Sequence, residues 1–101
     1  MNWPERMNAA IAFIEVRLHG ELSLEDVAGV ARCSKYHFQR VFYAAFQVTC
    51  AEYIRRRRLT LAAVALMNSD QSIAGIALNF GYDSPNAFTR AFRNVHGVNP
   101  S

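Results

Sequence analysis

The feature that most constrains the fold of this chain is an internal repeat. Residues 23–28 (SLEDVA) match residues 72–77 (SIAGIA) at an offset of 49, and residues 38–42 (FQRVF) match residues 88–92 (FTRAF) at an offset of 50. The second copy therefore has one extra residue between its two matching segments. Each copy predicts a short helix, a tight turn and a longer helix.

The hydrophobic periodicity is helical nearly everywhere, and no strand is predicted. We expect a first helix from Asn2 to His19, with Pro4 in its first turn and Gly20 ending it. Its apolar stripe is Met7, Ile11, Ile14 and Leu18. The other five helices are expected at about 24–32, 35–46, 50–68, 73–80 and 85–96, with Ser23, Ser34, Thr49, Ser72 and Ser84 before their first turns. The phenylalanines at helical spacing are expected in the core: Phe38, Phe42, Phe46, Phe80, Phe88 and Phe92.

A short helix, a tight turn and a longer helix make a helix-turn-helix, and Ala28 and Ala77 are small enough for two helices to cross there. We therefore predict an all-α protein in which two helix-turn-helix subdomains of homeodomain-like type are joined by a long linker helix. The predicted division is 1–48 for the first subdomain, 49–68 for the linker helix and 69–101 for the second subdomain.

A helix-turn-helix places its second helix in the major groove of DNA while its first helix crosses the backbone. A linker of about 20 residues is roughly 30 Å long as a helix, and one turn of B-DNA is about 34 Å. The linker could thus hold two recognition helices in successive major grooves. We expect the chain to cover roughly 20 base pairs on this basis.

The charge is uneven along the chain. Residues 1–50 carry five basic and five acidic side chains, whereas residues 51–101 carry six Arg and three acids, which accounts for the net charge of +3. Ten of the eleven basic residues are Arg, whose planar fork suits phosphate oxygens and guanine edges. This bias favours a nucleic-acid partner.

Other classes of function find little support in the composition. Cys33 and Cys50 have no metal-type spacing, so we expect reduced structural thiols, no metal and no cofactor. The chain shows no signal peptide and no apolar run long enough to span a membrane, so we expect a cytoplasmic protein without a membrane partner. Nothing places a nucleophile, a base and an orienting carboxylate together, and we expect no enzyme.

The residues resemble the AraC/XylS-type DNA-binding domain, most of all its MarA/Rob-like branch, from about residue 8 to residue 101. The resemblance rests on residues 34–42 (SKYHFQRVF), on residues 53–59 (YIRRRRL) with Ala62 following, and on Ile76-Ala77 through Gly81-Tyr82 to residues 88–92 (FTRAF). It continues through residues 97–101 (GVNPS). This ordered set is far more specific than a single helix-turn-helix match.

The resemblance implies a bacterial, sequence-specific transcription regulator that inserts both recognition helices into adjacent major grooves. By motif position, Tyr36, Gln39 and Arg40 carry base and phosphate contacts, and Pro85, Asn86, Thr89 and Arg90 occupy the matching positions of the second copy. The full set of residues expected to bind DNA is Lys35, Tyr36, His37, Gln39, Arg40, Tyr43, Arg56, Ser84, Pro85, Asn86, Thr89, Arg90 and Arg93.

Three positions depart from the family pattern. Arg32 stands in the first turn and Gln47 at the end of the first copy, where the family usually has Gly. A left-handed backbone at either position costs a non-Gly residue about 1 kcal/mol. Pro85 has no polar side-chain group with which to read a base edge.

Family members normally continue into a short closing helix, so we expect the C-terminal end to be cut short and the chain to be the N-terminal DNA-binding part of a longer regulator. The expected partners are double-stranded DNA and RNA polymerase. A small-molecule effector would act only through a domain outside this chain.

Several alternatives stay open. The chain could be a protein-interaction module of a regulator, or the DNA-targeting domain of a repair protein.

Arg55 to Arg58 span nearly a full helical turn, so they cannot all face DNA, and we expect one or two phosphate contacts against a background of ion pairs. Arg58, four residues after Ile54, is the member expected to be structural. We expect base reading mainly from the first copy and more phosphate-weighted contacts from the second.

Overall fold

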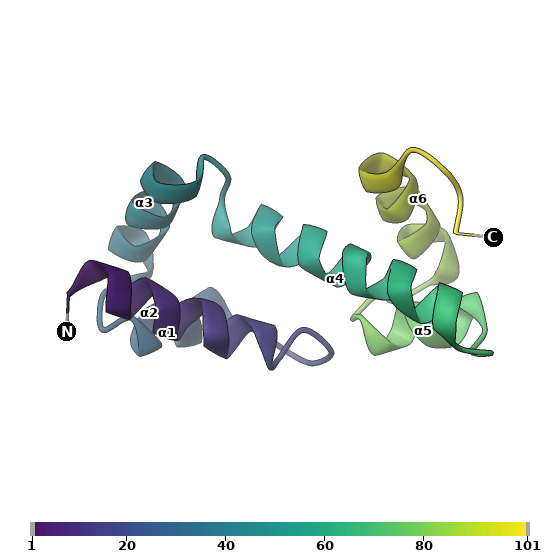
Figure 1. Cartoon of the computed structure of the whole chain (residues 1–101), viewed down its shortest axis with the longest axis horizontal. Coiled ribbons are helices and arrows are strands. Elements are labelled where there is room, and N and C mark those ends of the chain that lie inside the picture. Colours follow the sequence, from purple (N-terminus) through teal and green to yellow (C-terminus); the bar gives the residue numbers. More distant parts are fainter. Residues whose placement is uncertain (1, 101) are drawn as a thin grey trace. The chain divides into compact units, whose positions relative to one another are not determined.

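A computed structural model of the chain describes residues 2–100. Over these residues it contains six α-helices and no strand (Figure 1). The helices are α1 (Trp3–Glu15), α2 (Leu24–Val30), α3 (Lys35–Phe46), α4 (Cys50–Asn68), α5 (Ile73–Asn79) and α6 (Pro85–His96). The predicted all-α class is confirmed. The expectation that concerns the end of the chain at Ser101 lies outside the described residues.

The chain divides into two compact units, residues up to Ile54 and residues from Arg55 onward. The division falls inside α4, so each unit includes one end of that helix. Ile54 is buried in the first unit, and Leu59 and Ala62 are buried in the second. The three-part division at residues 48 and 68 stays a prediction.

The first unit is built on α1, α2 and α3, of which α1 packs against α2 and α2 against α3. Met7, Ile14 and Leu18 are buried as the apolar stripe predicts, and Ile11 is half-buried. The predicted end of the first helix was wrong by several residues. The helix ends at Glu15, and Val16 N–H makes its last bond of α-helical spacing, to Ala12 O. The chain then continues with the tighter bonds from Arg17 N–H to Ile14 O and from Gly20 N–H to Arg17 O.

Serine and threonine side chains start the helices where the sequence predicts. The Ser23 and Ser34 hydroxyls each accept a hydrogen bond, of 3.1 Å, from the backbone N–H three residues later. Ser72, Ser84 and Thr49 do the same before α5, α6 and α4. Each bond satisfies one of the amide groups that a helix N-terminus leaves without a partner. The helix starts are therefore local properties of the sequence.

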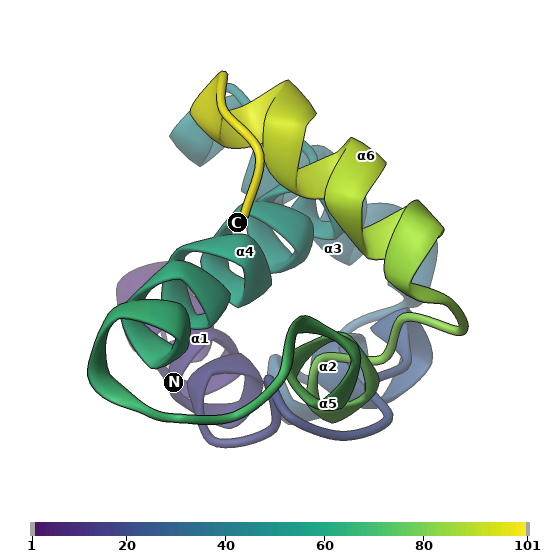
Figure 2. The same ribbon diagram turned by 90° about the vertical axis from the view of Figure 1, so that its right-hand side faces the viewer.

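The second unit has one apolar core made by α4, α5 and α6. Its buried side chains are Leu59, Ala62, Ile76, Ala77, Phe80, Phe88 and Phe92. In Figure 2, α5 is seen nearly end-on while α6 runs across the view, so the two helices of this copy cross steeply. Phe88 and Phe92 lie on one face of α6, and the opposite face is left to solvent.

One predicted core residue is not buried. Phe46 is 44% exposed, because it is the last residue of α3 and only its inner face packs, on Phe42, at 4.7 Å between ring centroids. The other five predicted core phenylalanines are buried. The prediction failed at a helix end, where no further turn covers the outer side of the ring.

The two copies share their turn geometry. Arg32 has φ = 60° and Gln47 has φ = 63°, and the matching positions of the second copy are Gly81 with φ = 85° and Gly97 with φ = 77°. Arg32 and Gln47 therefore both adopt the left-handed backbone that is costly to a non-Gly residue. The same backbone occurs with glycine in one copy and with a longer side chain in the other.

Candidate nucleic-acid interface

The outer face of α3 carries polar and aromatic side chains at helical spacing. Tyr36 is 70% exposed and Tyr43 is 53% exposed, although both rings are large. With Gln39, Arg40 and Ala44 they line one open hollow of about 380 Å³. The Arg40 guanidinium lies 5.7 Å from the centroid of the Tyr36 ring, a cation–π distance. Residues three, four and seven apart share a helix face, so α3 presents these four predicted site residues together.

The face is held outward by the opposite side of the same helix. Phe38 and Phe42 are fully buried, and their rings meet at a tilt of 48° with 5.8 Å between centroids. Phe42 also meets Tyr53 of α4 edge-on at 5.7 Å, and the Tyr53 hydroxyl donates to Glu15 Oε2 at 3.0 Å. These contacts leave α3 no freedom to turn its polar face inward.

His37 lies on a different side of α3. Its ring meets the ring of Trp3 nearly edge-on, with 5.4 Å between centroids and 69° between planes. His37 also lines a second hollow, of about 350 Å³, with Arg40, Val41 and Ala44. His37 is exposed, so the edge-on contact with Trp3 leaves it accessible beside the main polar face.

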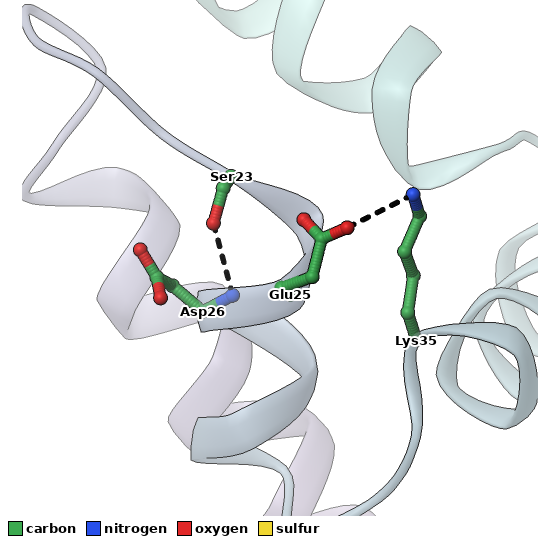
Figure 3. Close-up of polar contacts among 4 residues, drawn as sticks. All are labelled: Ser23, Glu25, Asp26 and Lys35. Atoms are coloured by element: carbon green, nitrogen blue, oxygen red, sulfur yellow. Dashed lines mark hydrogen bonds and ion pairs between the residues drawn. The ribbon is translucent and has the colours of Figure 1, made fainter.

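Lys35 is paired within the chain. Its Nζ lies 3.1 Å from Glu25 Oε1 at the start of α2, as Figure 3 shows. The backbone N–H of Glu25 and, after it, the Lys35 ammonium lower the pKa of the Glu25 carboxyl. Both side chains are exposed, so water and salt weaken this pair and DNA could compete for Lys35.

The first turn of α6 matches the first turn of α3 in position but not in chemistry. Pro85, Asn86 and Arg90 are exposed, and Thr89 is half-buried. The Ser84 hydroxyl accepts from Ala87 N–H, which leaves its own proton available as a donor. Ser84 and Pro85 also line a small hollow of about 110 Å³ with Ala74, Ala77, Leu78, Tyr82 and Asp83.

Arg93 on α6 is occupied within the second unit. Its Nε and Nη2 both donate to Asn99 Oδ1, at 2.8 and 2.6 Å. Arg93 matches Tyr43 of the first copy in the repeat. A phosphate would have to share or replace the amide oxygen of Asn99 to bind this guanidinium.

The four consecutive arginines of α4 differ in exposure. Arg56 is exposed, whereas Arg55, Arg57 and Arg58 are half-buried. Arg58 Nη1 lies 3.8 Å from the position that a Cβ would take at Gly81. Burial raises the pKa of the Tyr82 hydroxyl, and the positive charges of Arg55 and Arg58 partly oppose that rise. Arg55 and Arg58 therefore lie beside the turn of the second unit, which leaves Arg56 as the outward-facing candidate.

Two residues near the N-terminus touch the first helix-turn-helix, and sequence reasoning did not place them in the site. These residues are Trp3 and Arg6, both in α1. The Arg6 guanidinium stacks on the Trp3 ring at 3.9 Å from its centroid. Trp3 and Arg6 are three residues apart at the start of a helix, which predicts that they share a face. Their partners at residues 31, 32 and 37 lie too far along the chain to be predicted from that spacing.

Metal sites, reactive thiols and membrane-spanning helices are three other features to consider in the described residues, 2–100. There, no three His, Cys, Asp or Glu side chains are grouped as a metal ion would require. Cys33 is half-buried, and Cys50 is buried, which raises the pKa of the Cys50 thiol to about 11. No described helix combines the length and the apolar character needed to cross a membrane.

Comparison with known proteins gives a consistent result. A family described as "Helix-turn-helix domain" matches residues 27–101. The chain is 39% identical over 100 residues to the uncharacterized HTH-type transcriptional regulator YbfP of Bacillus subtilis, a match that covers 99% of this chain and 34% of YbfP. The chain thus spans about a third of the length of that relative.

Solved structures agree with the sequence match. A transcriptional regulator of Chromobacterium violaceum, described by its AraC-type DNA-binding domain, superposes with a TM-score of 0.90 at 25% identity, over 96% of this chain and 87% of that one. The DNA-binding domain of AdpA, solved in complex with a target DNA, superposes with a TM-score of 0.86 at 26% identity, over 94% of this chain and 86% of that one.

Proposed function

The chain belongs to the AraC-type helix-turn-helix DNA-binding regulators, and from this premise we propose that it binds duplex DNA by inserting α3 and α6 into adjacent major grooves. The observation that carries the proposal is a helix-turn-helix present twice, each time with a polar outer face on its second helix. The 19 residues of α4 correspond to about 28 Å of helix, close to the roughly 34 Å of one DNA turn.

The proposed roles of the two recognition helices differ. On α3, Gln39 and Arg40 read base edges, for which an amide and a guanidinium suit adenine and guanine respectively. Tyr36 and Tyr43 flank them and contact sugar, phosphate or the thymine methyl group, and His37 and Lys35 add phosphate contacts at the edges of this face. On α6, Asn86 and Thr89 are the polar base-reading candidates, since Pro85 offers only apolar contact.

Phosphate contacts position the protein without reading sequence. Arg90, Arg93 and Ser84 take this role on α6, and Arg56 takes it on α4. Arg90 and Arg56 are exposed, and Arg93 must share its guanidinium with Asn99. The second unit therefore contributes affinity more than base preference.

The cellular role proposed here is that of a bacterial transcription regulator acting in the cytoplasm. YbfP carries the name of a transcriptional regulator and is about three times as long as the matched region, which supports a further domain in a protein of this kind. In this proposal RNA polymerase is the protein partner, and any small-molecule effector binds outside the described residues. No catalytic step is part of the proposal.

The experiment is a duplex selection followed by a salt titration. Wild-type chain selects a duplex from a random library, and its affinity for that duplex is then measured at several salt concentrations. Replacing Arg40 and Arg90 together by Ala should weaken binding and reduce the salt slope by roughly one unit for each phosphate that is no longer neutralised. A charge control is Arg17→Ala, which removes one positive charge, where the double variant removes two, from a side chain stacked on Phe13 just after α1. An unchanged affinity and slope in the double variant would contradict the proposal.

A further inference from the structure

The first turn of α1 contacts the turn between α2 and α3. Arg6 Nε donates to Ala31 O at 2.6 Å, and Arg6 Nη2 donates to Arg32 O at 2.8 Å. Ala31 is the residue that ends α2, and Arg32 is the residue that follows it. One guanidinium therefore satisfies two successive carbonyls at the point where the chain leaves the first helix of the motif, and its charge suits the negative end of a helix.

The turn that Arg6 holds is strained. Arg32 has φ = 60°, a left-handed conformation that side chains with a Cβ adopt at a cost, and the second copy has Gly81 at this position. The backbone itself makes the bonds Cys33 N–H to Ala28 O and Arg32 N–H to Gly29 O. The carbonyls of Ala31 and Arg32 accept their hydrogen bonds from the Arg6 guanidinium.

The same side chain is linked to the recognition helix. Arg6 stacks on the Trp3 ring at 3.9 Å, and Trp3 meets His37 of α3 at 5.4 Å. Arg6 is half-buried, and its bond to Ala31 O is partly shielded from water, whereas its bond to Arg32 O is exposed. The pair thus contacts the end of α2 through Arg6 and the start of α3 through Trp3.

We propose that Arg6 and Trp3 are positioning residues for DNA reading by α3. They hold the strained turn at Arg32 and the side of α3 at His37, and so set the angle at which Tyr36, Gln39 and Arg40 meet the groove. The inference rests on the proposed function. The same contacts explain why the first copy tolerates a non-glycine residue in its turn, because they come from outside the motif and oppose the strain at Arg32.

A double-mutant cycle tests the proposal on the duplex selected by the wild-type chain. Arg6→Ala is made with Arg32 intact, with Arg32→Ala and with Arg32→Gly. Both changes at Arg32 remove the same charge, but only glycine relaxes the left-handed backbone. Circular dichroism sets a temperature at which every variant is folded, and the measurements are affinity and a hydroxyl-radical footprint of each half-site.

Arg6→Ala should weaken binding about tenfold, the size expected when a displaced helix no longer makes one good base contact. The weakening should be confined to the footprint of α3, should persist with Arg32→Ala, and should shrink to a few-fold with Arg32→Gly. Arg6→Lys should not rescue binding, because one ammonium cannot reproduce the fixed fork that spans both carbonyls. Arg17→Ala, just after α1, is the control that removes the same charge, and it should leave the α3 footprint unchanged.

If Arg6→Ala weakens binding equally in the Arg32→Ala and Arg32→Gly backgrounds, the role of Arg6 at the turn is overturned. Equal weakening of both half-site footprints would overturn positioning of α3 in favour of a general loss of structure. If the single variant Arg6→Ala does not fold, the proposal is tested by comparing the double variant of Arg6→Ala and Arg32→Ala with the double variant of Arg6→Ala and Arg32→Gly. Only the variant with Arg32→Gly should then recover folding and binding. A wild-type chain that selects no duplex would overturn the proposed function and this inference together, whereas selection with no effect of Arg6→Ala would overturn the inference alone.

Discussion

The two helix-turn-helix copies of this chain have the same backbone plan and reach it with different residues. The second copy places Gly81 and Gly97 at the two left-handed positions, and the first places Arg32 and Gln47 there. The second copy meets the conformational demand locally. The first copy meets it with contacts from α1, where Arg6 bonds the carbonyls of the turn.

The recognition helices also differ, and here the first copy has the more favourable residues for reading bases. On α3 the four residues Tyr36, Gln39, Arg40 and Tyr43 share one hollow, and each of them is aromatic or can make paired hydrogen bonds. On α6 the matching positions are Asn86, Thr89, Arg90 and Arg93, and the last of these is held by Asn99. The copy with the strained turn therefore carries the richer reading face.

The largest expected effect tests whether each copy has its own core. Phe38 and Phe88 match in the repeat and both are fully buried. Phe38→Ala and Phe88→Ala should each lower the free energy of unfolding by about 3–5 kcal/mol, measured by denaturant titration. Amide exchange should rise mainly in the unit that carries the change. Equal loss of protection in both units by either variant would show that they unfold as one.

The next largest effect is the change in stability on substitution at the left-handed turn position, and it should have opposite signs in the two copies. Gly81→Ala should cost about 1–2 kcal/mol because alanine resists φ = 85°, although its Cβ would meet only Arg58 at an ordinary 3.8 Å. Arg32→Gly should stabilise, by up to about 1 kcal/mol, since relief of strain exceeds the added entropy of the unfolded chain. Thermal and denaturant unfolding measure both, and Gly29→Ala, inside α2 with open space around it, is a control expected to stabilise. Destabilisation by Arg32→Gly would contradict the strain at this turn.

These turns show what the sequence predicts well. Helix starts, left-handed positions and the apolar stripes depend on a side chain and its neighbours within one or two turns, and Ser23, Ser34, Ser72 and Ser84 all cap as expected. The repeat also predicted the order of the elements, because the same local signals recur 49 or 50 residues later.

The rest depends on residues far apart in the chain. Lys35 and Glu25 are 10 residues apart, and Arg6 and Arg32 are 26 apart, so neither contact can be read from periodicity. The end of α1 and the exposure of Phe46 were also missed, since each is decided by whether another element covers a helix terminus. The expected site residues stay predictions, for which the structure supplies accessible positions and, for Lys35 and Arg93, competing partners.

A smaller effect, on pH, should appear in the first unit from pH 9, whereas the raised pKa of Tyr82 affects the second unit only near and above pH 10. The buried Cys50 thiol has its pKa raised from 9.0 to about 11, so between these values the unfolded chain releases a proton that the folded chain keeps. The free energy of unfolding should therefore fall as pH rises from 9 towards 11, by about 1 kcal/mol per pH unit, and the loss should be absent below pH 9. Cys50→Ala should remove the slope between pH 9 and 10, below the range in which Tyr82 contributes, and a slope that remains there would assign it to another group.

The smallest expected effect concerns the ion pair at the start of the first motif. Glu25→Gln releases Lys35 and removes a negative charge near the proposed phosphate contacts, so affinity for the selected duplex should rise modestly and the salt slope should steepen. Asp26→Asn is the matched control, since it removes the same charge from the same turn and leaves the Lys35–Glu25 pair in place. If both variants gain equally, charge alone explains the change and the pairing of Lys35 does not matter.

The central claim is that the two copies contribute unequally, with base reading by α3 and phosphate-weighted binding by α6. The most direct measurement repeats the duplex selection with Arg40→Ala and with Arg90→Ala and compares the base preferences of the two half-sites. The account predicts that Arg40→Ala relaxes the preference at one or two positions of one half-site. It predicts that Arg90→Ala weakens binding and lowers the salt slope while the preferences persist. Relaxed preference in the Arg90 variant, with preference retained in the Arg40 variant, would contradict it.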